Sequence, residues 1–309
     1  MLENTTKQNH IILLSGINEQ KDNFIKLQYN ENTKEIYNIA LTKFIKYLET
    51  NQINEIILNE ININTILKAY KKHLITLKLA NKTINTYLII VQTFFKNLGI
   101  KTTIDKVENT TKTKEYKYLT IHEINKIIET IPQTTKNKEL QARNKAIILL
   151  MFSAGLRVNE LINIKRNDYF KKDDVYYISI IGKGKLTKDI LPIAPETSKE
   201  INNYLETKKH KDNIYLFSNI RNQKLTRQGI NKTLKQIAIK TDKENDLNIT
   251  PRISSHVFRH SLARYLLINK QLPINQVKDI LRHKNIETTI QYLTTSQSEI
   301  NEIRLNIFN

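Results

Sequence analysis

The chain has 309 residues, a formal net charge of +19 and no cysteine. Its length favours two domains, and the lack of cysteine excludes disulfides and cysteine-ligated zinc. No apolar run approaches the roughly 20 residues of a membrane span, and the first residues do not resemble a signal peptide, so we expect a cytoplasmic protein without a membrane partner.

Helical periodicity dominates the first hundred residues. Apolar residues recur at steps of three and four, which predicts helices at about 18–29, 31–50, 63–79 and 81–98. Helices joined by short connections make a small bundle. The stretch 100–115 is rich in Thr and Lys without an apolar stripe, which is typical of a linker. We therefore expect an N-terminal helical domain over 1–111 and a second domain over 112–309.

The second domain begins with a helix-start signal. Thr120 and Glu123 have the spacing of a capping box and predict a helix to about residue 130. A second helix is predicted over 144–152 and is stopped by Gly155. Two runs rich in β-branched and aromatic residues, 174–182 and 187–193, predict a hairpin, and the chain from Pro195 onward is mostly helical. The fold class is therefore mainly α with a small antiparallel β-sheet.

The positive charge is concentrated in the second domain. Residues 1–116 contain 16 lysines against 11 acidic residues, whereas residues 117–309 contain 33 lysines and arginines against 19 acidic residues. All ten arginines follow residue 142. A basic surface attracts polyanions, and a guanidinium makes a two-pronged contact with phosphate. Nucleic acid is the first candidate partner; the alternative is a lysine-rich compositional bias.

Two short segments carry candidate phosphate-binding groups. Arg157 follows a helix stop and opens the predicted helix 158–164, where free N–H groups favour an anion; it is otherwise a surface arginine paired with Glu160. His256 and Arg259 are three residues apart and share a helix face, whereas His260 is expected to point elsewhere.

Three more residues complete the candidate set. Lys183 lies between two glycines at the tip of the predicted hairpin, where an ordinary turn lysine is the alternative. His283 follows the predicted helix 274–281, and a helix-end histidine is its alternative. Tyr292 lies nine residues further on, and the usual fate of a tyrosine is a core position.

In combination and order, these segments resemble the tyrosine recombinase (phage-integrase-type) family, and within it the Xer recombinases. The motifs that carry the resemblance are AGLRVNEL at 154–161, IGKG at 181–184, HVFRH at 256–260, LRH at 281–283 and TTIQY at 288–292. The resemblance implies a helical DNA-binding domain followed by a catalytic domain. It assigns phosphate-binding roles to Arg157 and Arg259, the hairpin lysine to Lys183, active-site histidines to His256 and His283, and the nucleophile to Tyr292.

One position departs from the family pattern. Leu-Gly-His is usual where this chain has Arg282 between Leu281 and His283. Because arginine lacks glycine's freedom at positive φ, we expect either that the turn is made differently or that Arg282 contacts DNA. The tail after Tyr292 has room for a helix over about 297–307, which in the family packs on the neighbouring protomer.

The resemblance implies a site-specific recombinase that cleaves and rejoins duplex DNA through a 3′-phosphotyrosyl link, without metal, ATP or cofactor. It implies a tetramer on two DNA sites, homomeric or shared with a second recombinase, and a DNA translocase as a further partner. Chromosome dimer resolution is the leading role. The alternatives are a mobile-element integrase, a topoisomerase, and a non-catalytic DNA-binding protein of the same fold. The segment 226–239, with Arg227, Gln228, Asn231 and Lys232, and the N-terminal helices are candidates for the major groove; the alternative is that these residues face solvent.

Overall fold

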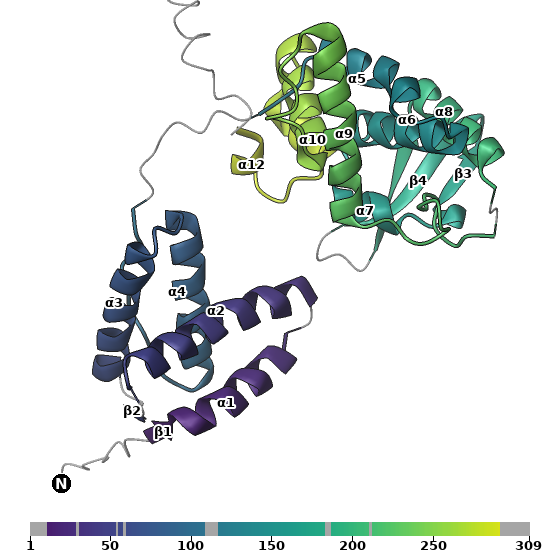
Figure 1. Cartoon of the computed structure of the whole chain (residues 1–309). Helices are drawn as coiled ribbons and strands as arrows, with labels where there is room; N and C mark the ends of the chain where they lie inside the picture. The colour runs from purple at the N-terminus through teal and green to yellow at the C-terminus, as the bar shows by residue number, and fades with distance from the viewer. Residues whose placement is uncertain are drawn as a thin grey trace, which may run out of the picture. The chain divides into compact units, whose positions relative to one another are not determined.

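The computed structural model describes residues 11–28, 31–53, 55–57, 60–108, 117–182, 187–209 and 212–290. The chain forms two compact units, Met1–Thr113 and Lys114–Asn309 (Figure 1). Each unit has its own hydrophobic core.

The N-terminal unit is a helical bundle with a short strand pair. Its described helices are α1 (Leu14–Lys26), α2 (Glu31–Thr50), α3 (Glu60–Thr76) and α4 (Asn81–Asn97). Aromatic side chains fill the core between these helices, where Phe44 packs edge-on against Tyr70 and Phe95. Strand β1 (Ile11–Leu13) pairs antiparallel with β2 (Glu55–Ile57), a pairing that the sequence analysis did not predict.

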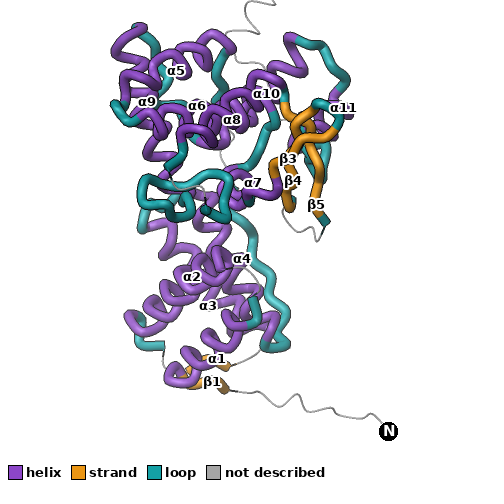
Figure 2. Tube along the Cα trace, turned by 90° about the vertical axis from the view of Figure 1, so that its right-hand side faces the viewer, coloured by secondary structure: helices purple, strands orange, loops and turns teal. Residues whose placement is uncertain are grey.

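The second unit combines helices with a three-stranded antiparallel sheet in the order β3-β4-β5 (Figure 2). The strands are β3 (Tyr169–Lys172), β4 (Val175–Ile181) and β5 (Lys188–Ile193). The predicted hairpin is confirmed as β4 and β5. Strand β3 was missed because it is a four-residue edge strand, too short for an alternating pattern to stand out. Ile178, Ile180 and Ile193 extend from the sheet into the core of this unit.

Helices supply the rest of the second unit. They are α5 (Ile121–Thr134), α6 (Lys138–Ser153), α7 (Val158–Asn163), α8 (Pro195–Thr207), α9 (Arg227–Asn245), α10 (Ser255–Arg264), α11 (Ile274–Ile280) and α12 (Glu287–Ile290). Helix α6 begins six residues earlier than predicted, because Asn137 caps its N-terminus by accepting the N–H of Leu140 at 3.1 Å. In the part of the chain that the structure describes, no helix has the length and apolarity to cross a membrane.

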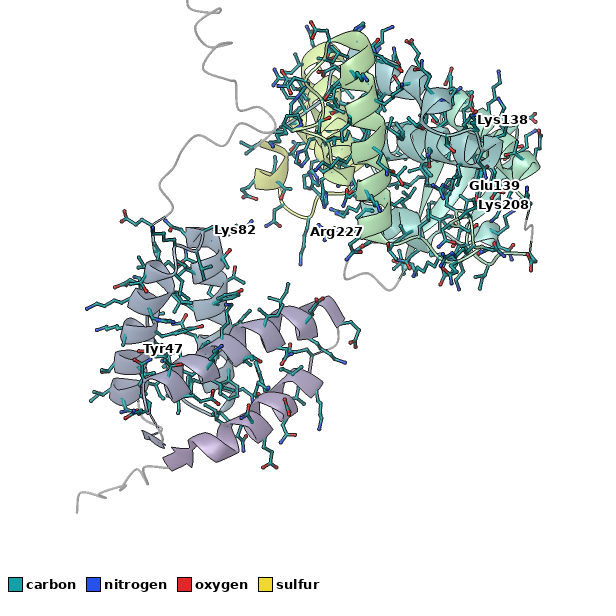
Figure 3. All side chains as sticks on the ribbon, in the orientation of Figure 1. Tyr47, Lys82, Lys138, Glu139, Lys208 and Arg227 are labelled. Atoms are coloured by element: carbon teal, nitrogen blue, oxygen red, sulfur yellow. The ribbon has the colours of Figure 1, made fainter. Side chains whose placement is uncertain are left out.

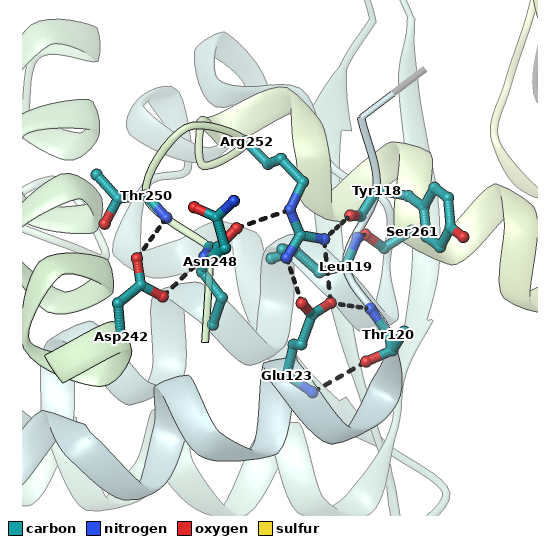
Figure 4. A network of polar contacts seen from close by, with 10 residues as sticks. Tyr118, Leu119, Thr120, Glu123, Asp242, Asn248, Thr250, Arg252 and Ser261 are labelled. Atoms are coloured by element: carbon teal, nitrogen blue, oxygen red, sulfur yellow. Dashed lines mark hydrogen bonds and ion pairs between the residues drawn. The ribbon is translucent and has the colours of Figure 1, made fainter. Parts of the chain in front are cut away.

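A polar network ties the start of α5 to the loop before α10 (Figure 4). The predicted capping box is confirmed: Glu123 N–H donates to Thr120 Oγ1 at 3.1 Å, and Thr120 N–H donates to Glu123 Oε2 at 2.8 Å. Arg252 binds the same carboxylate through both terminal nitrogens and donates to Tyr118 O at 2.8 Å. Leu119 N–H donates to Ser261 Oγ on α10 at 2.8 Å. Tyr118, Leu119 and Thr120 therefore connect the start of this unit to the helix that carries two predicted site residues.

Candidate active site

The turn between α6 and α7 places Arg157. Gly155 adopts φ of +57°, the left-handed conformation that glycine accepts without a Cβ penalty, and α6 ends there as predicted. Arg157 then occupies the N-cap of α7, and its Nη1 lies 2.8 Å from Glu160 Oε1. The same carboxylate accepts the backbone N–H of Arg157 at 2.9 Å. The pairing with Glu160 is therefore present, while 30% of the Arg157 side chain remains exposed to a ligand.

Helix α10 places Arg259 at the centre of the site. The residue is only 3% exposed. Its two terminal nitrogens donate to the carbonyl oxygens of Gly155 and Leu281, one in the turn after α6 and one in the turn after α11. Arg259 thereby joins two segments that are far apart in the sequence.

His256 lies one turn earlier on α10, among cations. Although the residue is exposed, the surrounding protein removes part of the hydration of its imidazole. This loss of hydration, followed by the charges of Arg227, Arg259 and Arg157, lowers its pKa. The imidazole is therefore neutral at pH 7, and a neutral imidazole can accept a proton.

His283 is the buried histidine of the site. It is 6% exposed, and its Nδ1 lies 2.7 Å from the hydroxyl of Thr289 in α12. Burial lowers its pKa to about 4, with smaller contributions from the charges of Arg259, Arg157 and Arg282. It is a neutral hydrogen-bonding group at pH 7.

These contacts bring together the α6–α7 turn, α10 and the turn after α11. Arg259 bonds the turns that precede Arg157 and His283, and Glu160 pairs with both Arg157 and Arg282. The charges of Arg157 and Arg259 lower the pKa of His256. Lys183 and Tyr292 lie outside the described residues, as does the predicted tail helix, and their roles remain predictions.

The structure corrects the expectation for Arg282. The residue itself adopts φ of +56°, so the turn keeps the left-handed conformation although it contains no glycine. Its side chain is 10% exposed and turns inward to Glu160, with Nη2 3.1 Å from Oε2. The alternative that the turn is made differently is therefore wrong, whereas a contact between Arg282 and DNA stays a prediction.

The prediction for His260 was also wrong. Its ring centroid lies 6.5 Å from that of His256, because residues i and i+4 share a helix face. His260 is also among the groups that lower the pKa of His283. Sequence spacing alone could have placed it beside His256.

Helix α9 contributes to this region as well as to the surface. Arg227, in its first turn (Figure 3), is one of the charges that lower the pKa of His256. Asn231 accepts the backbone N–H of Ser255 at 2.9 Å and so caps α10 next to His256. Asn231 was predicted to face the DNA groove, and the contact that the structure shows for it is with the start of α10. Gln228 and Lys232 are exposed, as a groove contact requires.

The described residues offer no cluster of three or more His, Asp or Glu side chains that could hold a metal ion. What the site does offer is cationic. The guanidiniums of Arg157 and Arg259 together with neutral imidazoles suit an anion with negatively charged oxygens, such as a phosphodiester.

The comparisons with known proteins agree with this chemistry. Residues 117–299 match the phage integrase family. The chain therefore belongs to this family as a tyrosine recombinase, the class of enzyme that cleaves and rejoins DNA strands. The match spans the three segments that form the site.

The relatives include several Xer proteins. Tyrosine recombinase XerD of Staphylococcus epidermidis is 27% identical over 304 residues, covering 94% of this chain and 97% of the relative. XerC of Leptospira interrogans is 29% identical over 294 residues, covering 91% and 89%. XerA of Pyrococcus horikoshii is 28% identical over 303 residues, covering 96% and 95%.

Solved structures share the fold. XerH in a post-cleavage complex with its palindromic difH substrate has a TM-score of 0.64 at 20% identity, covering 88% of this chain and 79% of that one. A lambda integrase dimer bound to a COC′ core site has a TM-score of 0.65 at 16% identity, covering 93% and 97%. The expected fold class, a helical N-terminal bundle followed by a tyrosine-recombinase catalytic domain, is confirmed.

Proposed function

We propose that this protein is a site-specific recombinase that cleaves duplex DNA through a 3′-phosphotyrosyl intermediate on Tyr292. The observation that carries the proposal is the convergence of Arg157, Arg259, His256 and His283 from three separate segments. A cationic site with neutral imidazoles can stabilise a phosphodiester transition state and remove a proton from a nucleophile.

The proposed reaction begins with proton transfer. Tyrosine has an ordinary pKa of about 10, so a base is needed at pH 7. His256 accepts the phenolic proton, and the Tyr292 oxygen forms a bond to phosphorus. Arg157 and Arg259 neutralise the nonbridging oxygens, while the bond from phosphorus to the 5′ oxygen breaks and Lys183 donates a proton to that oxygen. Each positioned acid or base contributes about 10²–10⁴ in rate.

The intermediate can be resolved on a second strand. The phosphotyrosyl bond retains the energy of the phosphodiester, so a free 5′-hydroxyl can attack phosphorus and release the tyrosine. This reversal requires no ATP or metal. His283, held by Thr289, hydrogen-bonds the phosphate or supports the tyrosine.

Chromosome dimer resolution is the biological role that we favour. Its support is the run of Xer relatives, which match this chain over most of their own lengths. We infer a cytoplasmic protein that acts as a tetramer on two DNA sites, alone or with a second recombinase, and with a translocase as a further partner. A mobile-element integrase is the second candidate. The observation that supports it is the fold shared with the Tn1549 transposon integrase, with a TM-score of 0.64 at 15% identity.

The decisive experiment is covalent trapping on a nicked suicide substrate. Wild-type protein is expected to form a protein–DNA adduct, whereas Tyr292→Phe forms none and binds the same DNA with Kd within about threefold, because only the nucleophilic oxygen is lost. Tyr177→Phe is the matched control, since Tyr177 lies on the sheet and stacks on Phe170. An undiminished adduct from Tyr292→Phe would reject the assignment.

The same assay separates the classes of protein. If the protein only binds DNA, the wild-type chain forms no covalent adduct at any DNA concentration. An enzyme that cleaves and reseals a single duplex gives adduct without exchange. Strand exchange between two labelled sites identifies a recombinase.

A further inference from the structure

Arg282 occupies an unusual position for an arginine. It adopts φ of +56°, a conformation that costs a residue with a Cβ roughly 1 kcal/mol. Its side chain is nine-tenths buried and makes an ion pair with Glu160 at 3.1 Å. Its Nη1 lies 3.4 Å from the carbonyl oxygen of Ala154, and its buried Nε has no hydrogen-bond partner among the described residues. The strained backbone is thus combined with a side chain directed into the protein.

Glu160 is shared between two arginines. Glu160 is 5% exposed. Its carboxylate binds Arg157 Nη1 through Oε1 at 2.8 Å and Arg282 Nη2 through Oε2 at 3.1 Å. Two guanidiniums on one carboxylate leave a net positive charge. The orientation of this carboxylate determines where Arg157 is held, because Arg157 contacts it through both backbone and side chain.

Arg282 also links the same two turns that Arg259 links. Arg259 donates to Gly155 O and to Leu281 O, whereas Arg282 belongs to the second turn and reaches Ala154 O and Glu160 in the first. Both contacts of Arg282 cross between segments more than 120 residues apart in sequence. A second link of this kind restricts movement of the α6–α7 turn relative to the turn that carries His283.

We propose that Arg282 is a positioning residue that acts through Glu160 to hold the Arg157 guanidinium in place for the scissile phosphate. The inference rests on the proposed function, because it assigns Arg282 to the same cleavage site. In this proposal the Arg282 guanidinium stays on Glu160 and on the carbonyl oxygen of Ala154, and it does not contact the phosphate. Small displacements of a positioning group cost up to about 10²-fold in rate.

The test compares Arg282→Gly with wild type in single-turnover cleavage of the nicked substrate at saturating DNA. Glycine accepts positive φ, so the turn is kept and only the side chain is removed. We expect the cleavage rate to fall about 10- to 100-fold while Kd for the same DNA changes less than about threefold. Arg282→Lys, which keeps the charge but loses the fork, recovers part of the rate. Lys284→Ala removes a neighbouring exposed charge and is expected to leave the saturated rate unchanged.

A double-mutant cycle with Arg157 distinguishes positioning from a general structural role. If Arg282 acts through Arg157, then Arg282→Gly slows cleavage by less than about threefold in an Arg157→Lys background, since interacting residues are not additive. Equal losses in both backgrounds overturn the proposal, as does an unchanged rate in the single variant. Weaker DNA binding with a wild-type saturated rate also overturns it, because Arg282 is then a DNA ligand.

Failure of the proposed function and failure of the positioning role give different results. If wild-type protein forms no adduct, the proposed function fails; if wild type and Arg282→Gly cleave equally, only the positioning role fails. Thermal melts accompany every variant. If Arg282→Gly melts below the assay temperature, Arg282→Gln replaces it in both backgrounds, because glutamine has the same backbone requirement as the native arginine and lacks the charge.

Discussion

At the scale of single residues, His283 couples the site to the stability of its own unit. Its pKa is about 4 when folded, because of burial and then the charges of Arg259, Arg157 and Arg282, against about 6.5 for an unfolded histidine. Between these pH values the unfolded chain binds a proton that the folded chain does not. The free energy of unfolding therefore falls as pH drops from about 6.5 to about 4, by at most about 3 kcal/mol from this residue.

Denaturant titrations of wild type and His283→Asn at pH 7.5, 6.0 and 5.0 measure this contribution. Asparagine keeps a polar atom near the Thr289 hydroxyl but cannot be protonated. The variant is expected to lose less stability than wild type between pH 7.5 and 5.0. His122→Asn, at an exposed position of α5, is the control and should follow wild type. Parallel pH dependences for wild type and His283→Asn would contradict the prediction.

Four residues of the candidate site could be predicted from the sequence, whereas the position of the Arg282 side chain could not. Arg157, His256, Arg259 and His283 were identified from motif order, and the structure links all four by contacts or close charges. The inward turn of Arg282 could not be predicted, because it depends on a buried carboxylate from a segment 122 positions away. Spacing along the chain carries no information about that encounter.

At the scale of elements, the turn after α6 depends on Gly155. A Cβ at this position would lie 2.9 Å from Leu281 Cδ2 and 3.0 Å from Leu262 Cδ2, in addition to the cost of φ at +57°. Gly155→Ala is therefore expected to lower the free energy of unfolding of the second unit by about 2–3 kcal/mol and to slow cleavage, because the turn carries Arg157.

Gly99→Ala provides the matched control. Gly99 has φ of +83°, but a Cβ there would meet no atom within 4 Å. Its substitution carries the backbone cost alone, about 1 kcal/mol in the N-terminal unit. Denaturant titrations of both variants measure the difference, and equal costs would show that the Leu262 and Leu281 contacts relax freely.

Elements with a long apolar stripe or a capping signal were predictable. The helix expected over 31–50 is α2, and the Thr120–Glu123 capping box opens α5. The pairing of β1 with β2 was missed, because each strand has three residues and their partners are about 44 positions apart. Short strands are formed by their partners and not by a local pattern, so a single sequence shows them poorly.

At the scale of the whole molecule, the two units differ in net charge, and each contains a hydrophobic core cluster of its own. The second unit contains most of the basic excess and every arginine of the chain. Among the described residues, the N-terminal core is built from aromatic and aliphatic side chains of α1–α4, and the second core from β3–β5 and the helices that follow the boundary. Among the described residues, no buried side chain is shared between the two core clusters.

This separation predicts that each unit folds alone. Fragments 1–113 and 114–309 are expected to unfold cooperatively, each with a Tm within a few degrees of the corresponding transition in the full chain, because each fragment contains a hydrophobic core cluster of its own. Circular dichroism melts and calorimetry of the two fragments and the full chain measure this. A cut at 136/137, which detaches α5 from Ile147 and its neighbours in the second core, is the control and should abolish the cooperative transition of the C-terminal fragment. A fragment 114–309 that is unfolded at temperatures where the full chain is native would show that the N-terminal unit stabilises the site directly.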